Sequence, residues 1–106
     1  GEMAFSSQDD KVQIESEFSA KQVYLLIFTT HGYPEGLESE PVSDLYSLTS
    51  SSKLSGSGEL TIRAEEEGEL MIMGYDGSEW QEFKTTTEGK MATATVDLME
   101  LYVVVK

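Results

Sequence analysis

The stretch Asp76–Lys106, DGSEWQEFKTTTEGKMATATVDLMELYVVVK, decides the fold class of this chain. Two turn signals, Asp76-Gly77 and Glu88-Gly89-Lys90, divide it into runs rich in β-branched and aromatic residues. These runs predict a short strand over Glu79–Lys84, followed by strands over Met91–Val96 and Leu98–Val105. The pattern is typical of the last hairpin and closing strand of an all-β domain.

The same kind of pattern extends upstream. Residues 11–18 alternate between apolar and polar side chains, which predicts a strand with one face in water. Gln22–Thr30 is apolar on both faces, and we predict it as a central strand. Residues 1–10 are polar after Phe5, and we expect them to form a flexible N-terminal lead-in.

The middle of the chain contains a long loop, an ambiguous segment and two further strands. His31–Pro41 holds two prolines and two glycines, which predicts a loop. Val42–Leu48 fits a helical turn about as well as a strand. Thr49–Gly58 is rich in serine and glycine, a composition typical of a mobile connection. Apolar and polar residues alternate again at residues 60–64 and 70–75, on either side of an acidic turn, and we predict a strand at each.

Together these segments predict seven or eight short strands in a single domain over residues 11–106. The close spacing of the turn signals favours an antiparallel β-sandwich of immunoglobulin-like kind. A length of 106 residues suits one domain with a modest core.

The chain is strongly acidic, with 20 Asp and Glu against 7 Lys and Arg and a net charge of -13. Such a surface repels phosphate backbones and anionic lipids, so we expect no nucleic-acid partner. The longest apolar run, Val23–Phe28, is far too short for membrane insertion. Cysteine is absent, which removes disulfides, thiolate metal sites and cysteine nucleophiles.

No residue pattern in the sequence indicates catalysis. His31 is the only histidine and lies in a turn-like context, and Gly-x-Ser-x-Gly does not occur. The acidic cluster in Ala64–Glu69 is confined to one turn, where its carboxylates cannot face one another across a cleft. We therefore predict that the protein is not an enzyme.

Calcium is the one cofactor that the acidic loops bring into consideration. Calcium binds six to eight oxygen ligands, often from loops between strands. Asp76, Ser78 and Glu79 form one candidate cluster, and Asp9 with Asp10 forms another. Neither matches an EF-hand loop. Solubility is the plainer explanation of the acidic residues.

Aromatic residues are the main candidates for ligand binding. Sugars stack on exposed aromatic rings, and Tyr75 and Trp80 flank the Asp76–Ser78 turn while Tyr33 lies in the long loop. A lone tryptophan in a sandwich is also typical of a core residue. Exposure of Trp80 would distinguish the two interpretations.

Residues Tyr75–Lys106 resemble the C-terminal strands of immunoglobulin-like β-sandwich modules in bacterial and archaeal cell-surface proteins. Tyr-Asp-Gly is followed by a Trp, a Thr-rich stretch, a Gly turn, Thr-Ala-Thr-Val and a final aromatic strand. Similar closing strands occur in the self-cleaving GAIN-like sandwiches, which usually carry His-Phe-Ser before the last aromatic strand. Asp97–Tyr102 stands at that place here, so the resemblance does not imply self-cleavage.

The resemblance implies an extracellular or cell-surface module with a structural or adhesive role and a protein or glycan partner. The alternative is a carbohydrate-binding module that uses Trp80, Tyr75 and Tyr33. Strand-mediated self-association is a further expectation, because edge strands accept strands from other chains. Leu98–Val105 and the stretch around Phe5 are the segments that we expect could be donated.

Overall fold

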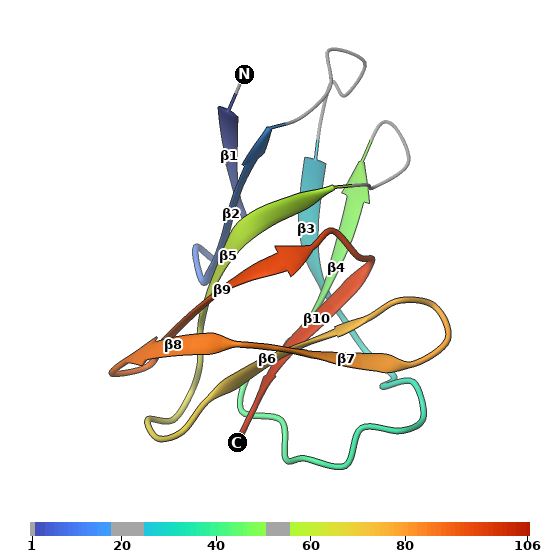
Figure 1. Cartoon of the computed structure of the whole chain (residues 1–106), viewed down its shortest axis with the longest axis vertical. Helices are drawn as coiled ribbons and strands as arrows, with labels where there is room; N and C mark the ends of the chain where they lie inside the picture. Colours follow the sequence, from blue (N-terminus) through green and yellow to red (C-terminus); the bar gives the residue numbers. More distant parts are fainter. Residues whose placement is uncertain (1, 18–24, 51–55) are drawn as a thin grey trace.

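The computed structural model describes residues 2–17, 25–50 and 56–106, which form ten strands and no helix (Figure 1). The strands are β1 Glu2–Ser6, β2 Val12–Glu17, β3 Leu25–Thr30, β4 Leu45–Ser50, β5 Ser57–Arg63, β6 Met71–Tyr75, β7 Trp80–Phe83, β8 Thr85–Glu88, β9 Met91–Asp97 and β10 Leu101–Val105. They make two five-stranded antiparallel sheets in the orders β1-β2-β5-β9-β8 and β3-β4-β10-β6-β7. The all-β prediction is confirmed.

One apolar core lies between the two sheets in a sandwich-like arrangement. Alternate residues of β2, β5 and β9 point inward, because successive side chains in a strand leave opposite faces. The buried residues of the first sheet are Val12, Ile14, Leu60, Ile62, Ala92, Ala94 and Val96; those of the second are Ile27, Tyr46, Leu48, Ile72, Tyr102 and Val104. The alternation of apolar and polar side chains that the sequence predicts therefore accounts for this core.

Gly74 on β6 makes room for large side chains inside the core. A Cβ at this position would lie 2.9 Å from both Met99 Sδ and Phe83 Cε2, and 3.0 Å from Tyr102 Cε1. The three side chains occupy the space that any larger residue would need. A glycine in a strand interior commonly marks such a close approach.

Hydroxyl groups support two of the connections at which the chain passes between sheets. Between β7 and β8, Thr85 Oγ1 accepts the Ile72 N–H at 2.9 Å and donates to the Phe83 carbonyl at 2.8 Å. Between β9 and β10, Tyr102 Oη accepts the Met99 N–H at 2.8 Å and donates to the Asp97 carbonyl. These bonds satisfy backbone groups where the ladders stop.

The pairing of β10 with β4 is interrupted at Ser43. The Val42 N–H donates to the Val104 carbonyl at 2.8 Å, so the preceding segment continues the ladder beyond β4. At the break, Ser43 Oγ accepts the Val104 N–H at 2.9 Å. Ser43 is one of the few buried polar residues among those described, and this bond explains its position.

Two expectations about strands were wrong, and one open alternative is resolved. Residues 2–6 pair with β2 although we expected a lead-in there, because Phe5 packs on the core opposite Ile14. The ambiguous Val42–Leu48 segment contributes to strand β4 and to no helical turn. Strands β1 and β8 were not predicted, and with them the structure has ten strands instead of the expected seven or eight.

One expectation about strand position was also wrong. β3 was predicted to be central but lies at an edge of its sheet, and β10 is the central strand of that sheet. Leu101–Val105 lies between β4 and β6, and residues 2–6 are paired with β2, so both expected donor segments pair within this chain. Their donation to another chain stays a prediction. Phe18, residues 22–24 and residues 51–55 of the predicted elements lie outside the described residues.

Candidate functional site

The outer faces of the two sheets differ in chemistry. The outer face of β1-β2-β5-β9-β8, here called the polar face, carries mainly Gln13, Glu15, Glu59, Thr61, Arg63, Thr86, Glu88, Thr93 and Thr95. The outer face of β3-β4-β10-β6-β7, here called the apolar face, carries mainly Leu26, Phe28, Leu45, Leu101, Val103, Val105, Met71, Met73, Tyr75 and Trp80, and also the polar Thr30, Ser47, Thr49 and Glu82. The second sheet is therefore apolar on both sides, which is unusual for an antiparallel sheet with one face in water.

Part of the apolar face is covered by the segment 31–44 that links β3 to β4. Leu37 of this segment and Trp80 of β7 pack against a small buried cluster of Leu45, Met73, Val103 and Val105. The indole Nε1 of Trp80 donates to the Pro34 carbonyl at 3.1 Å, which fastens the segment to the sheet. The covered part is a second, smaller core.

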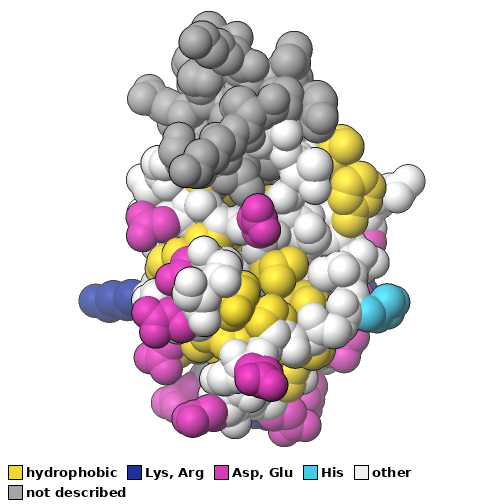
Figure 2. All heavy atoms as spheres, turned by 90° about the vertical axis from the view of Figure 1, so that its right-hand side faces the viewer, with side chains coloured by type: hydrophobic (Ala, Val, Ile, Leu, Met, Phe, Trp, Pro, Cys, Tyr) yellow, Lys and Arg dark blue, Asp and Glu magenta, His cyan; other side chains and the backbone are white. Residues whose placement is uncertain are grey.

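The remainder of the apolar face is partly open to solvent, most of all at Leu26 and Phe28. The strand register places Phe28, Ser47, Leu101, Tyr75 and Trp80 opposite one another in a row across all five strands. Phe28 is 48% exposed at one end of this row, and Leu26 beside it is 44% exposed. Figure 2 shows hydrophobic side chains gathered on the side of the molecule that it views, with acidic side chains around them.

The structure brings two of the three predicted aromatic residues into contact. The rings of Tyr75 and Trp80 have centroids 5.3 Å apart and meet edge to face at 61°. Trp80 is half-buried, so it is neither a core residue nor a fully exposed platform. Two rings at such an angle cannot together form one flat stacking surface for a sugar.

Tyr33 is 43% exposed and is held near the pair through the adjacent Pro34. Its hydroxyl lies 3.5 Å from the Ser43 carbonyl, at the long limit of a hydrogen bond. Burial, together with the nearby carboxylates of Asp44 and Glu65, raises the pKa of Tyr33. Tyr33 thus faces an acidic neighbourhood.

A hollow of about 720 Å³ lies between β4, the β6–β7 turn and the start of β10, and is here called the β10 hollow. It is lined by Ser47–Ser50 of β4, Asp76 and Gly77 of the β6–β7 turn, and Asp97–Leu101 before and at the start of β10. Its volume falls in the range of small-molecule sites. Hydroxyl and carboxylate groups in its wall can accept and donate hydrogen bonds to a polar ligand.

The candidate calcium ligands form a tight turn. Asp76 Oδ1 accepts the N–H groups of Ser78 at 2.8 Å and of Glu79 at 2.9 Å, and Oδ2 accepts the Gln81 side-chain amide at 3.0 Å. The bonds from the backbone of Glu79 and then Ser78 lower the pKa of Asp76. This carboxylate caps its own turn.

No group of three or more metal-ligating side chains occurs within the described ranges. Ser78 takes part in the Asp76 turn through its backbone N–H. Calcium binding at Asp76, Ser78 and Glu79 stays a prediction.

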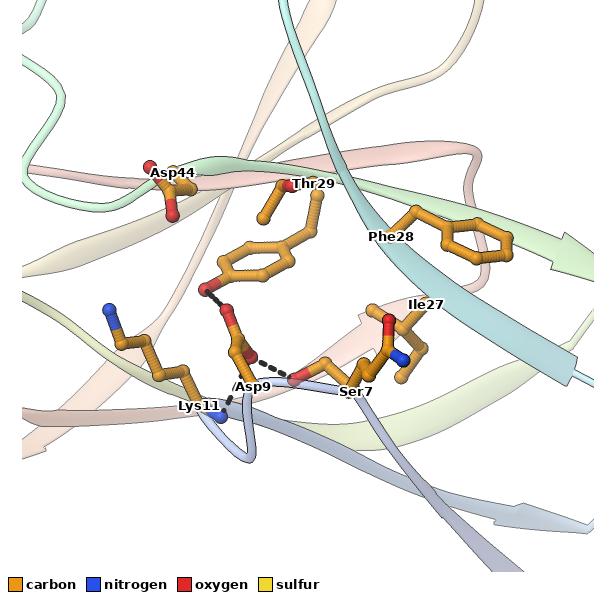
Figure 3. Close-up of a pocket in the computed structure, with 9 residues that line it drawn as sticks. Ser7, Asp9, Lys11, Ile27, Phe28, Thr29 and Asp44 are labelled. Carbon is orange, nitrogen blue, oxygen red and sulfur yellow. Dashed lines mark hydrogen bonds between the residues drawn. The ribbon is translucent and has the colours of Figure 1, made fainter.

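Asp9, named with Asp10 as a candidate calcium cluster, lies in a hollow of about 500 Å³ between β3 and the β1–β2 turn, here called the β3 hollow (Figure 3). The hollow itself was not foreseen from the sequence, and calcium binding at Asp9 and Asp10 stays a prediction. The lining residues of the hollow are Ser7, Gln8, Asp9, Lys11, Ile27, Phe28, Thr29, Asp44 and Tyr46. Asp9 accepts hydrogen bonds from Ser7 Oγ, from the Lys11 N–H at 3.0 Å and from Tyr46 Oη at 3.0 Å. Residues Asp9 and Tyr46 are 37 positions apart, so no local pattern could have paired them.

The electrostatics of the β3 hollow follow from those bonds. Burial works to raise the pKa of Asp9, but the hydrogen bonds from Ser7, Lys11 and Tyr46 outweigh it, and the pKa lies below its ordinary value. Burial and the bond to Asp9 raise the pKa of Tyr46. The ionised carboxylate of Asp9 therefore joins the β1–β2 turn of one sheet to Tyr46 of the other through a hydrogen bond, which is a structural role.

Comparisons with protein-family models, with curated proteins and with solved structures gave no significant match. In the part of the chain that the structure describes, there is also no helix able to cross a membrane.

Proposed function

We propose that the protein is a non-catalytic binding module of an extracellular or cell-surface protein, with a structural or adhesive role. The observation that carries this proposal is the contrast between the polar and the apolar face. Monomeric proteins rarely leave contiguous apolar surface in water unless it contacts a partner. Phe28 and Leu26, each about half exposed, begin such a surface. Leu101, Tyr75 and Trp80 continue it across the sheet as partly buried side chains, with Ser47 between Phe28 and Leu101.

We further propose that the fold is immunoglobulin-like. The order β2-β5-β9-β8 corresponds to strands A-B-E-D of that fold, and β7-β6-β10 corresponds to C′-C-F. Tyr102, near the start of β10, bonds back to Asp97 and Met99, as a tyrosine corner does at the start of strand F. β4 occupies the place beside β10 that strand G takes in that fold.

The setting at a cell surface rests on the resemblance of Tyr75–Lys106 to the closing strands of prokaryotic surface modules. An acidic, non-catalytic sandwich with one apolar outer face suits a module that holds another protein. Such an interface has an apolar centre and a polar rim, and the acidic residues Glu79, Glu82 and Glu100 are exposed near the row.

Bead adhesion tests the proposed function. Beads coated with the protein are exposed to surfaces of lysozyme, serum albumin, mucin, cellulose and chitin. We expect adhesion to a protein surface, a loss of at least tenfold with Leu101→Lys on the apolar face, and no loss with Thr95→Lys on the polar face. Equal behaviour of the two variants, or no adhesion to any of these surfaces, would contradict the proposal. Circular dichroism must show both variants folded.

A carbohydrate-binding module is the second candidate function. The contact of Tyr75 with Trp80 favours it, because a sugar could stack on one ring and place its hydroxyls in the β10 hollow, which is lined by Asp76, the residue after Tyr75. Trp80 is the only tryptophan, so its emission reports on this site alone. A spectral shift on titration with a soluble glycan, abolished by Tyr75→Ala, would support this function. Unchanged emission with every glycan would reject it.

A further inference from the structure

β3 differs from the other edge strands of the two sheets. The edges are β1, β8, β3 and β7, and each edge carries N–H and C=O groups that its sheet does not use. β1, β8 and β7 each contain a glutamate, which discourages pairing with other chains. β3 reads Leu-Leu-Ile-Phe-Thr-Thr and has no charge, proline or glycine. Among the described residues, only β4 pairs with it.

The side chains of β3 also favour an added strand. Leu26 and Phe28 lie on the apolar face, opposite Thr49 and Ser47 of β4, and both are about half exposed at 44% and 48%. An extended segment along β3 would place its alternate side chains next to them and remove their apolar surface from water. Only an extended backbone can satisfy alternate N–H and C=O groups of a sheet edge.

Space for the other side chains of an added strand lies in the β3 hollow. Ile27, Thr29 and Tyr46 line it from one sheet, and the β1–β2 turn lines it from the other. Figure 3 shows that Phe28 points away from Asp9, whereas Ile27 lies on the side of Ser7. Inward-facing side chains of an added strand would therefore enter the hollow, and outward-facing ones would contact Phe28.

Charge decides which kind of segment fits. The hollow contains the carboxylates of Asp9 and Asp44 against the single cation Lys11, and the whole chain has a net charge of -13. A second copy would bring the same negative charge, whereas a segment with Lys or Arg would be attracted.

We propose that β3 is a strand-acceptor site for an extended, basic segment of a protein partner with alternating apolar residues. The inference rests on the proposed binding function and names the partner's chemistry. The segment extends the sheet β3-β4-β10-β6-β7 by one strand, in the mode known as β-augmentation.

Peptide binding followed by amide hydrogen exchange tests the site. The probe is a nonapeptide of alternating lysine and valine, and its control is N-methylated at the three central residues, which removes N–H donors on either edge of the strand. We expect the first peptide to bind and to slow exchange at alternate amides of Ile27–Thr30 at least tenfold. We expect the N-methylated peptide, which keeps the same charge, to leave these amides unchanged.

A matched pair of variants locates the contact. Phe28→Ser removes an exposed apolar side chain from β3, and Met91→Ser removes one of similar exposure, 39%, from the other sheet. We expect Phe28→Ser to weaken peptide binding about tenfold and Met91→Ser to leave it unchanged. Equal binding of both peptides, equal effects of the variants, or protection outside β3 would overturn the proposal.

Self-association is the remaining outcome. Protection of the β3 amides that rises with protein concentration without peptide, together with a dimer in sedimentation equilibrium, would identify a second copy as the occupant and overturn the basic segment. The proposed function is tested separately. If β3 takes up no peptide but Leu101→Lys still abolishes bead adhesion, this inference fails and the proposed function stands.

Discussion

The phenol of Tyr46 on β4 donates a hydrogen bond of 3.0 Å to Asp9 in the β1–β2 turn, and this bond joins the two sheets at the β3 hollow. The ring of Tyr46 is fully buried, whereas Asp9 is exposed. We expect Tyr46→Phe to lower the free energy of unfolding by about 1 kcal/mol, less than for a buried charged pair because solvent reaches Asp9. Urea unfolding measures this, and Tyr33→Phe is the control. A loss no larger than that of the control would contradict the role of the bond.

The same bond predicts that the free energy of unfolding depends on pH in the acid range. Hydrogen bonding holds the pKa of Asp9 below 3.8 in the folded chain, so its contribution is complete above about pH 4 and is lost as the pH falls through the folded value. The difference in unfolding free energy between the wild type and Asp9→Asn should therefore be largest near pH 7 and shrink below about pH 4. A difference that stays constant down to pH 2.5 would contradict the assignment.

Alkaline pH should act through the two buried tyrosines. Burial raises the pKa of both Tyr46 and Tyr102 above the ordinary 10.0. Their contribution is complete below pH 10 and decreases above it, since only the unfolded chain ionises them readily. Absorbance at 295 nm should show one cooperative step as these two tyrosines ionise on unfolding. That step should coincide with the change in Trp80 emission on unfolding. Two tyrosinates that form in the folded state would disprove this.

Gly74→Ala should be costly although the substitution is small. The added Cβ would lie within 3.0 Å of Met99, Phe83 and Tyr102, so we expect a loss of about 1–3 kcal/mol of stability from overpacking. Thermal and urea unfolding measure the loss. Shortening Met99 to alanine in the same chain should reduce the cost of Gly74→Ala, because one of the three neighbours is then removed. An additive pair of substitutions would argue against the clash.

Trp80→Phe should release the segment 31–44 from the apolar face. The change removes the bond to the Pro34 carbonyl and part of the packing on Leu45 and Val103, and we expect a loss of about 1–2 kcal/mol. Amide exchange in residues 35–41 should accelerate. Tyr75→Phe keeps its ring and serves as the control. Unchanged exchange with Trp80→Phe would show that other contacts hold the segment.

The sequence predicted the parts of the fold that depend on local patterns. Alternation at Val12 and Ile14 and at Leu60 and Ile62 correctly identified strands with one inward face. Asp76-Gly77 and Glu88-Gly89 correctly marked the β6–β7 and β8–β9 turns. Local patterns do not say which strands pair, however, because pairing depends on residues far apart in the chain.

The errors have a common physical origin. Apolar residues on both faces of β3 resemble those of a central strand, but Leu26 and Phe28 are exposed at an edge. Tyr75 and Trp80 could be predicted as neighbours because they flank a hairpin turn. The hydrogen bond from Trp80 to the Pro34 carbonyl joins residues 46 positions apart, so no local pattern could predict it.

β10 is buried on both faces, which affects how the chain finds its correct alignment. In most antiparallel strands a slip of one residue moves apolar side chains into water and is rejected for that reason. In β10, Val103, Val104 and Val105 are all buried, so a slip would exchange one valine for another at little cost in burial. The Tyr102 hydroxyl bond to Asp97 and the Ser43 bond to the Val104 N–H would both break. The alignment of the central strand is therefore encoded in two hydroxyl groups rather than in the spacing of its hydrophobic residues.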